Sequence, residues 1–290
     1  MQIPILNGIF TDNEPSLKAS YPVNLMPVVQ ASGVSDGYLR PADGLVLKGE
    51  SSGVCRGGIL WNDVLYRVMG SKLVSIGTNG QSTIIGDVGG STAQVSMDYS
   101  FENLIIASNN NLFYYDGTTF QQVTDPDVGT VLDAIWVDGY TMTTDGEFII
   151  VTDLNAPTSV DPFKYGSSEI DPDPIKALLK LRNEPYALNR YTIEVFDNVG
   201  GDYFPFQRVN GAQIPKGTVG THACCVYMEM IAFVGGGRNE QPSVYMGLNG
   251  QVQRIATQAI DAILENFTEA QLSQIKVEAR NDRSNHFLYI

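Results

Sequence analysis

Three acidic, proline-containing segments hold the residues whose types and spacing could do chemistry. They are Asp125-Pro126-Asp127, Asp161-Pro162 and Asp171-Pro172-Asp173-Pro174. Two carboxyl groups about 5–10 Å apart can cleave a glycosidic bond, one as an acid and the other as a base or nucleophile. Asp-Pro pairs are also strong turn formers, and the turn interpretation is favoured for all three segments. None of them has the alternating oxygen ligands of a calcium loop.

The other reactive side chains are few and form no recognised catalytic motif. Neither His222 nor His286 lies near a Gly-x-Ser-x-Gly turn or a Cys in a nucleophile context. His222 directly precedes an apolar strand and is interpreted as a turn residue. The run Gly235–Arg238 lacks both the Lys-Ser/Thr pair and the following helix of a phosphate loop, so we expect a flexible loop between two strands. The sequence therefore predicts no enzyme, no cofactor and no metal site.

A repeated scaffold must position these segments. Short β-like runs separated by Gly, Asn and Asp turns recur about every 40 to 45 residues, which is the period of β-propeller blades. Turn pairs such as Asn62-Asp63 and Asp138-Gly139 are typical of tight hairpins between antiparallel strands. The complete units are Cys55–Val88, Ala93–Val123, Leu132–Tyr165, Ile175–Val209 and His222–Ile255.

A sixth unit begins at Ile275 and stops in mid-strand at Ile290. A propeller hides its strand edges by closing into a ring, so we expect the natural chain to continue beyond Ile290. A small irregular last blade, or closure by the N-terminal segment, is the alternative. The predicted fold class is all-β: a β-propeller of about six blades over residues 46–290, the last blade incomplete in this chain.

Two regions lie outside the repeat. Residues 1–45 are predicted to be an extended, proline-punctuated N-terminal arm that lies on its own propeller or on a neighbouring subunit. Residues 256–272 are predicted to be a short helical insertion, because apolar residues recur there at helical spacing. Thr268-Glu269-Ala270-Gln271 has capping-box form, which splits the insertion into two short helices. This insertion either packs on the propeller rim or docks a partner. The apolar positions are Ile260, Ile263, Leu264 and Phe267.

Composition agrees with a soluble all-β body. The 290 residues are 43% hydrophobic and 17% charged, with 29 Gly and 14 Pro that interrupt regular elements often. No apolar run approaches the roughly 18 residues of a membrane span, and the N-terminus lacks the form of a signal peptide. Of the cysteines, Cys224 and Cys225 are adjacent and Cys55 stands alone, so no Cys-x-x-Cys motif is present.

The net charge of −14 argues against sequence-specific nucleic-acid binding, which requires clustered cations. An acidic balance usually serves solubility. A second interpretation is a channel wall that repels a polyanion and lets it slide.

The chain resembles the tail-hub proteins of short-tailed phages (podoviruses), also called packaged-DNA stabilisation proteins or tail accessory factors. The resemblance begins in the arm and continues in order through nearly the whole chain. The segments that carry it in the arm and the first unit are Tyr21-Pro22-Val23-Asn24-Leu25, Gly37-Tyr38-Leu39-Arg40, Cys55-Arg56-Gly57, Val64-Leu65-Tyr66-Arg67-Val68 and Ser71-Lys72-Leu73. Those that follow are Gly86-Asp87-Val88, Ala93–Met97, Phe148–Leu154, Asp161-Pro162, Thr192–Phe196, Pro242–Tyr245 and Ile255-Ala256-Thr257.

This resemblance implies a structural virion protein of the phage tail, assembled in the host cytoplasm. Such proteins form a homohexameric ring or nozzle below the portal and its adaptor ring, and they continue the DNA channel. They receive a tail needle or plug and support tailspikes. Packaged DNA passes through the channel without sequence-specific binding, and no membrane partner is implied. Family members are longer than this chain and continue past the position of Ile290.

The family carries no catalytic residues to transfer. Asn24, Tyr38 and Arg40 are predicted subunit-interface residues, because they are polar or aromatic positions on an arm outside the repeat. The alternative for Tyr38 and Arg40 is that they tie the arm to its own first blade. The alternative function is a glycan-binding or glycan-cleaving phage propeller, with two carboxylates in a central pocket and aromatic sugar platforms nearby.

Overall fold

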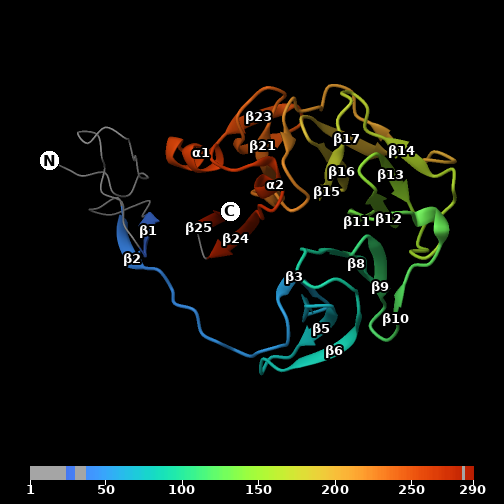
Figure 1. Cartoon of the computed structure of the whole chain (residues 1–290), viewed down its shortest axis with the longest axis horizontal. Helices are drawn as coiled ribbons and strands as arrows, with labels where there is room; N and C mark the ends of the chain where they lie inside the picture. The colour runs from blue at the N-terminus through green and yellow to red at the C-terminus, as the bar shows by residue number, and fades with distance from the viewer. Residues whose placement is uncertain (1–23, 30–36, 283–284) are drawn as a thin grey trace.

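A computed structural model describes residues 24–29, 37–282 and 285–290. Its strands form small antiparallel sheets arranged around a common centre, from the blue β3 to the red β24 (Figure 1). In the first four sheets the first strand lies innermost and the later strands lie further out (Figure 1), whereas in the fifth sheet β20 is the strand at the centre. The predicted all-β propeller class is confirmed.

The first four sheets each contain four strands in sequence order. The first contains β3 (Cys55–Trp61), β4 (Val64–Met69), β5 (Lys72–Ile76) and β6 (Ser82–Asp87). The second contains β7 (Ser96–Tyr99), β8 (Leu104–Ser108), β9 (Asn111–Tyr115) and β10 (Phe120–Gln122). The third contains β11 (Asp133–Val137), β12 (Tyr140–Thr144), β13 (Phe148–Val151) and β14 (Tyr165–Ser167), and a short 3-10 helix, η1 (Pro126–Val128), precedes it. The fourth contains β15 (Ile175–Leu181), β16 (Glu184–Asn189), β17 (Ile193–Asn198) and β18 (Phe206–Arg208).

The remaining elements complete the circle. The fifth sheet contains β19 (Gly217–Thr218), β20 (Cys224–Tyr227), β21 (Met230–Gly236), β22 (Ser243–Leu248) and β23 (Gln251–Arg254). Two helices follow, α1 (Gln258–Leu264) and α2 (Glu269–Leu272). The last sheet contains β24 (Glu278–Asp282) and β25 (Asn285–Tyr289).

Tight turns produce the hairpins within each sheet. Asn62 and Asp63 both have positive φ, 48° and 61°, between β3 and β4. Asn and Asp tolerate this left-handed conformation, and the primed turns that it builds match the twist of paired strands. Met228 and Glu229 adopt the same conformation, with φ of 50° and 59°, although neither residue favours it.

The hydrophobic core is divided among the spaces between neighbouring sheets. The first and second sheets enclose one cluster and the fourth and fifth another, so each sheet is stabilised mainly by the next. The first cluster includes Trp61, Val68, Leu73, Leu104, Ile106 and Phe113. The second includes Leu188, Val195, Ile214, Ile231 and Phe233.

The helical insertion packs against the face of the fifth sheet that points away from the fourth sheet. Leu264 and Leu272 are buried there with Val234 and Val244 of that sheet. Thr268 caps α2 in a capping box with Gln271, so the predicted split into two short helices is confirmed. Ile263 and Phe267 remain 58% and 40% exposed.

Two local predictions need correction. Gly235 and Gly236 end strand β21 rather than starting a loop. Gly217 of β19 passes so close to Gly235 that no side chain would fit there, and the loop begins only at Gly237. The described part of the arm is not simply extended, because β1 (Leu25–Val29) and β2 (Gly37–Pro41) pair as an antiparallel hairpin. Residues 1–23 and 30–36 of the arm lie outside the described residues.

Candidate functional site

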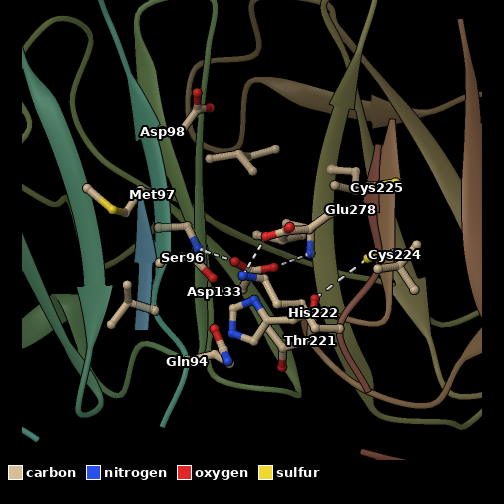
Figure 2. A pocket seen from close by; sticks show the side chains of 18 of the residues that line it. Gln94, Ser96, Met97, Asp98, Asp133, Thr221, His222, Cys224, Cys225 and Glu278 are labelled. Atoms are coloured by element: carbon tan, nitrogen blue, oxygen red, sulfur yellow. Dashed lines mark hydrogen bonds and ion pairs between the residues drawn. The ribbon is translucent and has the colours of Figure 1, made fainter. Parts of the chain in front are cut away.

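An axial pocket of about 410 Å³ lies where the innermost strands of all six sheets meet. Sequence analysis did not predict it, because its lining comes from segments far apart in the chain. Its polar residues are Gln94, Ser96, Asp98, Asp133, Lys180, Thr221, His222, Lys276 and Glu278. Asp133 lies near the centre of Figure 2, with Ser96 and His222 beside it.

Asp133 joins the third sheet to its two neighbours. Its side chain accepts hydrogen bonds from the backbone N–H of Leu178 (2.7 Å) on β15 and from that of Ala134 (2.9 Å). The Ser96 hydroxyl on β7 donates a further bond. Burial raises the pKa of Asp133 from 3.8 to about 6, despite these donors. The hydrogen bonds of this carboxyl group therefore hold the third sheet to the second and the fourth.

Asp98 repeats this arrangement one sheet earlier. It accepts the backbone N–H of Trp136 on β11 (2.7 Å) and pairs with the Lys180 ammonium of β15 (3.1 Å). Lys180 also donates to the Trp136 carbonyl (2.6 Å) and lies 5.3 Å from the centre of that indole ring. Side chains of the second, third and fourth sheets are thus linked at the axis.

Burial shifts the pKa of the histidine and of both cysteines of the pocket. Burial lowers the pKa of His222 to about 4, so its imidazole is neutral at pH 7. It lies in the turn before β20, as predicted. Burial raises the pKa of the Cys224 thiol well above its ordinary value and that of Cys225 to about 12. Both cysteines stay protonated at neutral pH, whereas a nucleophilic cysteine needs a lowered pKa.

The acidic segments near Pro residues serve mainly as turn and cap acceptors. Asp125 caps η1 and also accepts the backbone N–H of Val160 (3.1 Å). Asp173 accepts the backbone N–H of Tyr191 (2.5 Å), and Asp171 pairs with Arg238 (3.1 Å). Asp125, Asp171 and Asp173 are absent from the lining of the axial pocket, so these three predicted acids do not form the central acid pair that glycan cleavage would require.

Two other acids of these segments line the same groove. Asp127 and Asp161 line one groove of about 350 Å³ at the third sheet, here called the outer groove. The rest of its lining is largely apolar: Phe148, Ile150, Val160, Pro162, Lys164 and Tyr165. Within the part of the chain that the structure describes, no group of His, Cys, Asp or Glu side chains could hold a metal ion. No described helix has the length and apolar character to cross a bilayer.

The predicted interface residues belong to the β1–β2 hairpin. The Asn24 carbonyl accepts the backbone N–H of Ala42 (2.8 Å) at the base of the hairpin. Tyr38 lies opposite Val28 in the strand register and is 57% exposed. Arg40 is largely buried and pairs with Asp43 (3.4 Å).

A fully buried arginine, which sequence analysis did not single out as a site residue, joins the first two sheets. The Arg56 guanidinium donates to the carbonyls of Ala93, Gly70 and Gly89 and to the Ser108 hydroxyl, at 2.5–2.9 Å. Burial lowers its pKa. The sequence shows only an arginine followed by Gly57 and Gly58 in a strand, and this pattern does not reveal which carbonyls the side chain meets.

The geometry defines an all-β propeller whose axial groups tie sheets together. Residues 1–290 match the family described as bacteriophage P22 Gp10, beta-propeller, and the chain belongs to that family. The predicted resemblance to podovirus tail-hub proteins is thereby confirmed.

An individual phage protein is similar to the whole of this chain. The tail hub protein gp10 of Salmonella phage P22 is 28% identical over 309 residues, an alignment that covers 100% of this chain and 64% of gp10. The chain thus spans 64% of the length of that relative.

Solved structures resemble the chain in fold alone. A streptogramin B lyase has a TM-score of 0.51 at 12% identity, with coverage of 75% of this chain and 72% of the lyase. PorZ, a surface component of the type-IX secretion system of Porphyromonas gingivalis, has a TM-score of 0.49 at 16% identity, with coverage of 73% and 29%.

Proposed function

We propose that this chain is a non-enzymatic building block of a phage tail, a propeller that assembles with further copies into a ring-shaped hub or nozzle. The ring, a homohexamer, lies below the portal and its adaptor ring, and closes the DNA exit channel in the virion tail. It stabilises packaged DNA and provides attachment for a tail needle and tailspikes. Assembly takes place in the host cytoplasm.

The observation that carries this proposal is the match of the P22 Gp10 family to residues 1–290. The axial pocket supports it, because Asp98 and Asp133 accept hydrogen bonds that join neighbouring sheets. The axial pocket has a volume of about 410 Å³, the size of a small-molecule site. In this proposal the DNA channel therefore lies between several copies rather than along the axis of one propeller.

Asn24, Tyr38 and Arg40 belong to this proposal as subunit-interface residues. They lie on a two-stranded hairpin, and such hairpins are marginally stable without a covering surface. Tyr38 offers an exposed aromatic ring, the type of side chain enriched at interfaces.

Electron microscopy of assembled tails, together with native mass measurement of the full-length protein mixed with its adaptor, tests the proposal. We expect a six-fold ring in the tail and a hexamer bound to the adaptor. A full-length protein that stays monomeric with its adaptor, in a phage that retains DNA without it, would contradict the proposal.

A further inference from the structure

Three consecutive apolar residues where the arm joins the propeller, here counted with the arm, lie almost completely uncovered. Leu45 is 98% exposed, and Val46 and Leu47 are each 77% exposed. Residues 44–53 make no hydrogen bond to any described residue. An extended apolar segment with an unpaired backbone is a ready partner for another chain.

Among the described residues, the arm contacts the first sheet behind this apolar run. The Val54 carbonyl accepts the backbone N–H of Gly70 (2.8 Å), and the backbone of Lys48-Gly49 packs directly against Gly80. Residues 43–47 then continue away from the body toward the β1–β2 hairpin (Figure 1). The exposed run thus projects from a fixed position on the first sheet.

The outer groove lies on the opposite side of the molecule. Figure 1 shows β13 and β14, which contribute to it, at the far right, whereas the arm lies at the left. Tyr165 of the groove is 53% exposed, and the neighbouring Phe163 is 67% exposed. Phe163 packs against Tyr203, itself 64% exposed, with ring centres 6.2 Å apart. The groove and this aromatic pair form an uncovered apolar surface beside the edge strand β14.

Charge complementarity matches the groove to the arm. Lys48 directly follows the apolar run and makes no ion pair with any described residue. Asp127 and Asp161 line the groove, whereas its own cation, Lys164, already pairs with Asp153 (2.5 Å). The groove therefore carries an excess of negative charge, and the arm brings one positive charge beside three aliphatic side chains.

We infer that the arm of one copy docks in the outer groove of a second copy of this chain, with Leu45–Leu47 against Phe148, Val160 and Tyr165 and with Lys48 beside Asp127 and Asp161. Donor and acceptor lie on opposite sides of the same molecule, so the contact is head-to-tail. Repetition of such a contact gives a ring when the rotation between copies closes, and an open filament when it does not. This inference rests on the proposed ring function and names the surfaces that form it.

Mixed variants test this head-to-tail contact by analytical ultracentrifugation of the whole chain over a range of concentrations. The arm variant is Leu45→Ser/Val46→Ser/Leu47→Ser, and the groove variant is Tyr165→Ser/Asp127→Lys. We expect each alone to lose self-association by about tenfold or more. A mixture of the two should form 1:1 dimers and nothing larger, because only one competent arm and one competent groove remain. Ile84→Ser, which removes a 64% exposed aliphatic side chain elsewhere, is the matched control and should associate normally.

Cysteine cross-linking provides the geometric check in a Cys55→Ser background, because Cys55 is exposed. Val46→Cys on one copy and Pro162→Cys on another should form an intermolecular disulfide only when mixed. If the wild type associates but neither the arm variant nor the disulfide behaves as expected, the arm contact is overturned while the ring function stands. If the wild type stays monomeric at every concentration, the arm contact is overturned. If the full-length protein also stays monomeric when it is mixed with its adaptor, the proposed ring is contradicted as well.

Discussion

At the residue scale, the polar groups that matter most join neighbouring sheets instead of acting on a ligand. Arg56 is the clearest case, because its side chain is only 1% exposed and its hydrogen-bond partners among the described residues are neutral oxygens. Its guanidinium donates hydrogen bonds to three backbone carbonyls in connecting segments, where no neighbouring strand supplies a donor. A buried carbonyl without a donor is costly, so the arginine stabilises the turns of two sheets at once.

Replacing Arg56 with Ala should therefore lower the free energy of unfolding by about 3 kcal/mol or more, through lost hydrogen bonds and a cavity. Denaturant unfolding followed by tryptophan fluorescence measures the change, since Trp61 belongs to the adjoining core. Arg67→Ala, at an exposed position of the same sheet, is the control and should change stability by less than about 0.5 kcal/mol. Equal effects of the two substitutions would show that Arg56 has no special role.

The raised pKa of Asp133 predicts the direction in which the free energy of unfolding changes with pH. The folded state raises that pKa from 3.8 to about 6, so it binds the proton more tightly than the unfolded chain does. The stabilising contribution of this group is present below pH 4 and is lost as the pH rises through 6. The shift corresponds to about 3 kcal/mol as an order of magnitude. The stability difference between wild type and Asp133→Asn should shrink or change sign across this window.

The matched comparison is Asp87, whose pKa is lowered chiefly by a hydrogen bond from Lys72. Its contribution has the opposite sign, present at neutral pH and lost as the pH falls through the lowered folded pKa. Unfolding free energies of wild type, Asp133→Asn and Asp87→Asn between pH 3 and 7 separate the two cases. A difference curve for Asp133→Asn that is flat between pH 4 and 6 would show that the carboxyl titrates normally.

At the element scale, local sequence determined what could be predicted. A hairpin depends on a few adjacent residues, so Asn62-Asp63 and the capping box at Thr268 could be recognised directly. The links made by Asp98 and Asp133 join strands about 40 residues apart, and they depend on how the sheets are placed around the axis. The β1–β2 hairpin was missed although Asp36-Gly37 at the start of β2 is a turn signature, because the Pro residues of the arm favoured a single extended segment.

The helical insertion gives a prediction at this scale. Thr268→Ala removes the side-chain acceptor that caps α2 and should cost about 1 kcal/mol. Because Leu272 of that helix is buried against the fifth sheet, the loss should also loosen that sheet. Amide hydrogen exchange should be faster than in the wild type at α2 and on the side of the fifth sheet that faces β24. Thr268→Ser keeps the acceptor and should behave like the wild type; uniform acceleration over the whole chain would contradict a local role.

At the scale of the whole molecule, charge opposes assembly while uncovered apolar surface favours it. A net charge of −14 makes any two copies repel, and this repulsion reaches about 30 Å at 0.01 M salt but only about 8 Å at 0.15 M. The arm segment around Leu45–Leu47 contributes little to that charge. Two terms of opposite salt dependence therefore act on a ring of identical copies.

Self-association should strengthen severalfold when salt is raised from about 0.02 M to about 0.3 M, because screening weakens the repulsion while apolar contacts persist. Sedimentation at several salt concentrations measures the change. Lys48→Glu adds negative charge at the proposed contact, so it should weaken association most at low salt and least at high salt. A wild-type association that instead falls steeply with salt would mean that ion pairs, rather than the apolar arm, hold the copies together. Binding to duplex DNA offers an internal contrast, since counterion release makes it weaken with salt and the acidic surface should make it undetectable throughout.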